Sequence, residues 1–66
     1  SVSEMQVPED FLAALESVPK AKQFYETLTK SNRYVIANGL ESAKKPETRQ
    51  RRFTQFLDKL ARNEKP

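Results

Sequence analysis

Residues 46–63 read PETRQRRFTQFLDKLARN, and this stretch carries the strongest helical pattern of the chain. Its large apolar side chains, Phe53, Phe56, Leu57 and Leu60, recur at the spacing of one buried helix face. The stretch begins with proline, which is favoured at the first helical position because its missing N–H would have no partner there. The pattern predicts a helix over about 46–63 that packs its apolar stripe on the rest of the chain.

Three shorter helices are predicted upstream, over about 8–17, 19–29 and 32–44. Prolines stand at the first two starts, and Ser31 is the expected N-cap of the third. Gly39 lies inside the third helix, where glycine costs about 1 kcal/mol relative to alanine. We reject a hairpin at Asn38-Gly39, because the residues that follow have no strand preference, and expect Gly39 to permit a close helix approach.

The 66-residue length and the composition allow one small domain. The fold class predicted is all-α, a compact array of four short-to-medium helices over residues 7–64. Residues 1–6 are predicted to form a disordered tail and 65–66 a frayed end. Short connections favour angled helix packing over a long parallel bundle.

Phe11, Phe24, Phe53 and Phe56 are predicted to pack in the core rather than to stack on nucleobases, because each falls on the apolar stripe of its helix. For Tyr25 and Tyr34 we also favour packing, with the ring on the core and the hydroxyl in water. The alternative is an exposed pair of rings, which would indicate stacking or an interface.

Charge is divided unevenly along the chain. Residues 1–30 carry five acids and three lysines, net −2, whereas residues 31–66 carry nine basic residues and four acids, net +5. Such a division is typical either of a fold whose halves attract each other or of a surface for an acidic partner.

Catalysis and metal binding find no support in the sequence. Histidine and cysteine are absent, as are the Ser-x-x-Lys and Gly-x-Ser-x-Gly nucleophile motifs and any acidic cluster with calcium-loop spacing. We therefore predict no enzyme activity, no catalytic residue, no cofactor and no metal. With no apolar stretch long enough for a membrane span, we expect a cytoplasmic protein.

One constellation has binding chemistry: a basic turn that leads into the last helix. Its candidate residues are Lys44, Lys45, Thr48, Arg49, Arg51 and Arg52. At about 100° per residue, Arg49 falls about 40° from Phe53 on the apolar side, while Arg51 falls about 160° away and faces solvent. Arg52 lies one turn from Arg49, so the two guanidinium groups are placed to converge on one anion, beside the free N–H groups of residues 47–49.

A second interpretation gives Arg49 a structural role, which we favour. An arginine at the edge of a core commonly pairs with an acid of a neighbouring helix, and Asp10, Glu16 and Glu41 are the candidates. For Arg52, the structural and the ligand-binding interpretations remain open. Lys44 and Lys45 also suit the end of the preceding helix, where positive charge is favourable.

The order of residues resembles a known family. Val7-Pro8-Glu9-Asp10, Ser31-Asn32-Arg33 and above all Ala43-Lys44-Lys45-Pro46-Glu47-Thr48-Arg49, followed by Arg51-Arg52, resemble the bacteriocin-protection, OmpD-associated family of bacterial helical domains. The resemblance extends from about Val7 to Lys65. It implies a small helical module, often the C-terminal part of a longer protein, linked to envelope stress and to resistance against antimicrobial peptides or bacteriocins. It supplies no catalytic residue.

Two positions depart from the family pattern. A large aromatic residue often stands at the position of Gly39, and an aliphatic residue at that of Phe53. We expect these two exchanges to compensate each other sterically between the third and fourth helices.

Together these observations predict a non-enzymatic interaction module that docks an acidic partner protein, or a companion domain, through the basic turn. The alternative is anion or nucleic-acid binding through Lys44, Lys45, Arg49, Arg51 and Arg52, which predicts affinity that falls with salt. A monomer is favoured.

Overall fold

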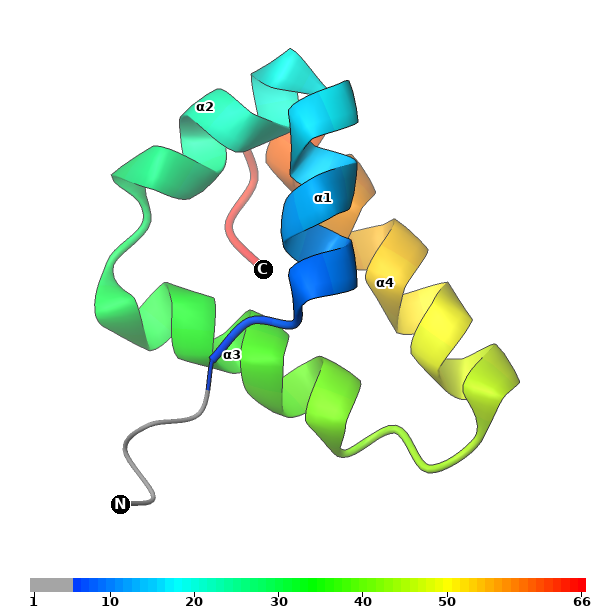
Figure 1. Cartoon of the computed structure of the whole chain (residues 1–66). Coiled ribbons are helices and arrows are strands. Elements are labelled where there is room, and N and C mark those ends of the chain that lie inside the picture. Colours follow the sequence, from blue (N-terminus) through cyan, green and yellow to red (C-terminus); the bar gives the residue numbers. More distant parts are fainter. Residues whose placement is uncertain (1–5) are drawn as a thin grey trace.

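A computed structural model describes residues 6–66 of the chain, and these form four helices (Figure 1). They are α1 (Glu9–Ser17), α2 (Pro19–Thr27), α3 (Lys30–Glu41) and α4 (Pro46–Ala61). No strand occurs within this part of the chain. The predicted fold class, a compact all-α array of four helices, is confirmed.

The helix ends differ from the predicted ones by up to three residues. The N-cap predicted at Ser31 is wrong, because the side chain of Thr29 accepts the bond from the backbone N–H of Asn32, at 3.3 Å, and α3 begins at Lys30. Leu28 and Thr29 have extended backbone and separate α2 from α3. The last helix ends at Ala61 rather than at about residue 63. The predicted tail over 1–6 lies outside the described residues, except for exposed Gln6.

The C-terminal end of α4 is capped by backbone hydrogen bonds rather than by a side chain. Asn63 has φ 60°, the left-handed conformation that asparagine tolerates better than most residues. Its N–H bonds the carbonyl of Leu60, and the N–H of Glu64 bonds that of Lys59. These two bonds form a Schellman motif, which satisfies carbonyls that the helix itself leaves without partners.

The longest helix, α4, packs against each of the other three (Figure 1). The helices cross at wide angles, as the short connections predicted, and α3 lies across the end of the array. Four fully buried side chains fill the centre, one from α1, two from α3 and one from α4: Phe11, Ile36, Leu40 and Leu60. Burying a side chain of this size is worth about 1.5–3 kcal/mol, so the core depends on α4 closing over the other helices.

The aromatic residues divide between core and surface. The ring of Phe11 is fully buried and meets that of Phe53 edge to face, with centroids 5.1 Å apart. Phe24, Tyr25 and Phe56 are partly buried against the core, so packing is confirmed for them. It is wrong for Tyr34, which lies on the outer side of α3 with 48% of its surface exposed.

Gly39 permits the close approach of α3 and α4, as expected. A Cβ atom at this position would lie 2.7 Å from Cζ and 2.9 Å from Cε2 of Phe56. The expected compensation between Gly39 and Phe53 is wrong, because the ring over Gly39 is that of Phe56 while Phe53 packs on Phe11. Both rings lie on the apolar stripe of α4, where Phe53 meets Phe11 of α1 and Phe56 meets Gly39 of α3.

Candidate functional site

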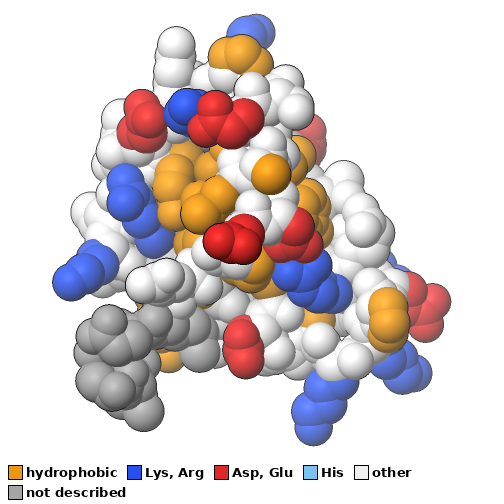
Figure 2. All heavy atoms as spheres, viewed as in Figure 1, with side chains coloured by type: hydrophobic (Ala, Val, Ile, Leu, Met, Phe, Trp, Pro, Cys, Tyr) orange, Lys and Arg blue, Asp and Glu red, His pale blue; other side chains and the backbone are white. Residues whose placement is uncertain are grey.

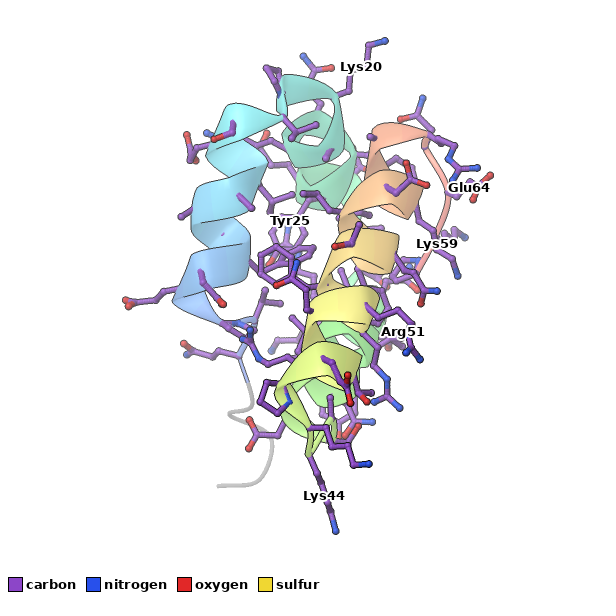
Figure 3. The ribbon with its side chains drawn as sticks, turned by 90° about the vertical axis from the view of Figure 1, so that its right-hand side faces the viewer. Lys20, Tyr25, Lys44, Arg51, Lys59 and Glu64 are labelled. Carbon is purple, nitrogen blue, oxygen red and sulfur yellow. The ribbon has the colours of Figure 1, made fainter. Side chains whose placement is uncertain are left out.

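The six candidate residues lie where α3 leads into α4, and we call this region the basic corner. It comprises Lys44, Lys45, Thr48, Arg49, Arg51 and Arg52. Lys44 extends from the end of the molecule, and Arg51 projects from the side of α4 that faces away from α1 (Figure 3). The structure gives these six side chains three different environments.

Arg49 joins the starts of α1 and α4. Its Nη1 donates to Oδ2 of Asp10 at 2.8 Å, and its Nη2 donates to Oδ1 at 3.1 Å, a two-pronged ion pair between residues 39 positions apart. The bonds from Arg49 hold the pKa of the Asp10 carboxyl below its ordinary value of 3.8, and the same contact raises the pKa of the guanidinium. Asp10 is one of the three acids named from the sequence, so the predicted pairing of Arg49 with an acid of a neighbouring helix is confirmed.

Arg52 closes the C-terminal end of α3. Its Nη1 donates to the backbone carbonyl of Gly39 at 2.8 Å and to Oγ of Ser42 at 3.0 Å. A cation at this end of a helix satisfies a carbonyl without a helical partner and interacts favourably with the helix dipole. The predicted convergence of Arg49 and Arg52 on one anion is therefore wrong, because each guanidinium is turned to a different partner within the chain.

The start of α4 offers fewer free donors than expected. The backbone N–H of Arg49 bonds the carbonyl of Lys45 at 3.0 Å, and the carboxylate of Glu47 adds a negative charge in the first turn. Negative charge at this position occupies the favourable electrostatic site that an external anion would use. The helix start is consequently a poorer anion site than the sequence suggested.

The remaining cations of the basic corner face solvent. Lys44, Lys45 and Arg51 are exposed and form no ion pair with any residue of 6–66, and Thr48 is half-buried beside them. These three cations are the part of the basic corner that is available to a partner without disturbing the fold.

A further arginine with several contacts, Arg33, was not among the candidate residues predicted from the sequence. Its guanidinium lies 4.7 Å from the centre of the Tyr25 ring, and Nη2 donates to the carbonyls of Tyr25 and Glu26, each at 3.3 Å. Burial of Tyr25 raises the pKa of its hydroxyl. Arg33 thus closes the end of α2 as Arg52 closes the end of α3. Its targets are backbone carbonyls across a turn, for which the sequence has no signal.

Next to Arg33 lies a half-open pocket between α1 and α2, with a volume of about 300 Å³. Its lining comprises Leu12, Leu15, Glu16, Lys22, Tyr25, Glu26 and Arg33. Figure 2 shows apolar side chains gathered on this face with charged groups around them. Nζ of Lys22 lies 2.8 Å from a carboxylate oxygen of Glu16, which raises the pKa of the lysine. No residue of the basic corner lines this pocket.

Residues 6–66 contain neither a helix that could span a membrane nor a cluster of metal-ligating side chains. No helix there is both long and apolar enough to cross a membrane. Within the same residues, no three histidine, cysteine or acidic side chains gather as metal ligands would.

Comparison with known proteins gives one result that concerns nearly the whole chain. Residues 4–63 match the family described as "Bacteriocin-protection, YdeI or OmpD-Associated", abbreviated OmdA. Searches of curated proteins and of solved structures find no match. Because the match spans both the basic corner and all four helices, the chain belongs to the bacteriocin-protection, YdeI or OmpD-associated family.

Proposed function

We propose that this chain is a non-enzymatic interaction module with a role associated with bacteriocin protection. In this proposal it docks an acidic surface, on a partner protein or on a companion domain of a longer parent protein, through Lys44, Lys45 and Arg51. Membership of the family supports the broad role. A cytoplasmic location is part of the proposal.

The docking surface is proposed because the basic side chains differ in whether they are bonded within the fold. Arg49 and Arg52 donate hydrogen bonds to other groups of the chain. In contrast, Lys44, Lys45 and Arg51 are exposed and have no ion pair within residues 6–66. Exposed cations attract an acidic surface over several ångströms and need not break an internal bond to meet it. The two engaged arginines contribute by fixing the orientation of α4.

A titration tests this surface. The chain, labelled with nitrogen-15, is titrated with a synthetic peptide of glutamate and serine at low salt. We expect amide shifts to concentrate at residues 44–52 and to disappear in the triple variant Lys44→Gln, Lys45→Gln, Arg51→Gln. The matched control neutralises three exposed lysines outside the corner, Lys20, Lys30 and Lys65, and therefore has the same net charge.

Retained binding in the control and loss in the corner variant support the proposal. Equal loss in both variants would show attraction by net charge alone and would contradict it. A DNA duplex that binds more tightly than the acidic peptide, with affinity falling steeply as salt rises, would replace it with nucleic-acid binding. The cytoplasmic location is tested separately by fractionating cells that produce the parent protein.

A further inference from the structure

One side of α3 is exposed, uncharged and partly apolar. Helix α3 lies across the end of the array, so this side is turned away from the other three helices (Figure 1). Four exposed residues follow it at i, i+3, i+4 and i+7, and we call them the α3 face: Ser31, Tyr34, Val35 and Asn38. Tyr34 and Val35 have 48% and 44% of their surfaces exposed. In a chain with 32% charged residues, a face that has no charge and an aromatic ring at its centre is typical of an interface.

The two charged residues among the exposed residues of α3 stand at its ends. Lys30 lies in the first turn and Glu41 in the last, whereas the helix dipole favours the opposite arrangement. Neither side chain forms an ion pair with any residue of 6–66, although Lys44 and Lys45 follow Glu41 closely in the chain. Both charges are therefore available to a group of opposite sign outside the chain.

The positions of these residues match a two-fold axis. At about 100° per residue, Lys30 and Glu41 lie within about 20° of each other around the helix, so both stand on the same flank of the α3 face. A two-fold axis perpendicular to the plane of two antiparallel helices keeps each flank on its own side while it exchanges the helix ends. Lys30 of one copy then lies beside Glu41 of the other. Tyr34 and Val35 are at the middle of the 12-residue helix, so the same pairing brings them onto their copies.

From this arrangement we propose that α3 binds the α3 of a second copy of the chain, antiparallel and across a two-fold axis. Tyr34 and Val35 of both copies form the apolar centre of the interface, and Lys30 of each copy meets Glu41 of the other. The pairing also sets each helix dipole beside the opposite end of its neighbour. One helix face is small compared with the roughly 1,200–2,000 Å² buried in stable complexes, so we expect a weak dimer that forms at micromolar to millimolar concentration.

Dilution tests whether the chain associates through this face. The dimer differs from the monomer that the sequence favours, and the α3 face shares no residue with the basic corner, so failure of either proposal leaves the other intact. Diluting the nitrogen-15-labelled chain from millimolar to low micromolar concentration is expected to shift the amides of residues 30–41, while analytical ultracentrifugation follows the fall in mean mass. Unchanged amides in α3 would overturn the proposal. Changes confined to residues 12–16 and 25–26 would also overturn it, because they would place the contact at the pocket between α1 and α2.

Charge reversal tests the pairing of the helix ends. Lys30→Glu and Glu41→Lys are each expected to weaken self-association about tenfold, because each change turns both attractive contacts of the dimer into repulsive ones. When the two variants are mixed in equal amounts, we expect them to associate about as tightly as the original chain, because every contact again joins opposite charges. The matched controls, Lys20→Glu and Glu64→Lys, have the same net charges and lie outside α3. Each control is expected to associate nearly as the original chain does, and mixing them should change little.

A third variant tests the apolar centre. Val35→Ser is expected to raise the dissociation constant of the dimer about fivefold or more, since the residue occurs twice in the interface. Its control, Leu12→Ser, removes an apolar side chain of similar exposure, 39%, from α1 and should leave association unchanged. Equal losses in a variant and its control, or no gain when the two charge-reversed chains are mixed, would overturn the proposal. All the substituted side chains are exposed, so we expect the variants to fold, which helical circular dichroism checks.

Discussion

Replacing Gly39 by alanine sets two effects of opposite sign against each other in α3. Alanine favours the helix over glycine by about 1 kcal/mol. The added Cβ, however, would lie 2.7 Å from Cζ and 2.9 Å from Cε2 of Phe56, closer than carbon atoms approach without something moving. The Phe56 ring is packed against the core, so it has little freedom to retreat.

The magnitude follows from these two terms. Overpacking of this kind costs about 1–3 kcal/mol, and the helix preference returns about 1 kcal/mol of it. We therefore expect Gly39→Ala to lower the free energy of unfolding by about 1 kcal/mol, which in a domain of this size lowers the melting temperature by about 4–8 °C. Separation of α3 from α4 would also lengthen the bond from Arg52 to the carbonyl of Gly39.

The same substitution should change sign once the ring is removed. Leucine at position 56 lacks the Cε and Cζ atoms that meet the added Cβ. In the Phe56→Leu background, Gly39→Ala should therefore raise the free energy of unfolding by about 1 kcal/mol. Urea denaturation of the four proteins, followed by circular dichroism, gives the coupling between the two positions. A change at Gly39 that is the same in both backgrounds to within about 0.5 kcal/mol would refute the close contact.

Because Arg49 pairs with Asp10, we expect Arg49→Ala to lower the free energy of unfolding by about 0.5–1 kcal/mol. Arg51 faces solvent, so Arg51→Ala should lower it by less than about 0.5 kcal/mol. Equal losses of the two variants in urea denaturation would contradict these different environments. Because this pair lowers the pKa of Asp10 from 3.8, its stabilisation is complete above that value and is lost as the pH falls below it, a dependence that Asp10→Asn should remove from acid denaturation curves. Arg52→Lys should cost about 1 kcal/mol, since one ammonium reproduces the two bonds of the guanidinium poorly; an unchanged denaturation midpoint would show that charge alone suffices. Thr29→Ala should cost about 0.5–2 kcal/mol by removing the N-cap of α3, and Thr29→Ser, which keeps the hydroxyl, should restore most of that loss.

The fold was predictable because its signals are local. Prolines mark three of the four helix starts or lie directly before them, and the apolar side chains follow the helical period. The boundary between α2 and α3 was less predictable, since Thr29 and Ser31 are both plausible caps and only the extended backbone at Leu28 and Thr29 decides between them.

The candidate site was predictable where side chains meet side chains. The position of Arg49 beside the apolar stripe indicated a partner on another helix, although three acids fitted and only the packing selects Asp10. Arg33 and Arg52 instead donate to backbone carbonyls, which every residue type carries and which therefore leave no mark in the sequence. Binding by the exposed cations stays a prediction.

Helix α4 is translated after α1, α2 and α3, and this order bears on how the domain folds during synthesis. Helix α3 makes its main contacts with α4, and α2 likewise packs chiefly there. Isolated helices as short as these first three are marginal in water. A ribosome that has released only residues 1–45 therefore carries a chain with its apolar stripes uncovered. Formation of the core therefore waits until α4 has been synthesised. A stop codon before Leu60 would remove one of the four large, fully buried side chains and leave the nascent chain open to proteolysis.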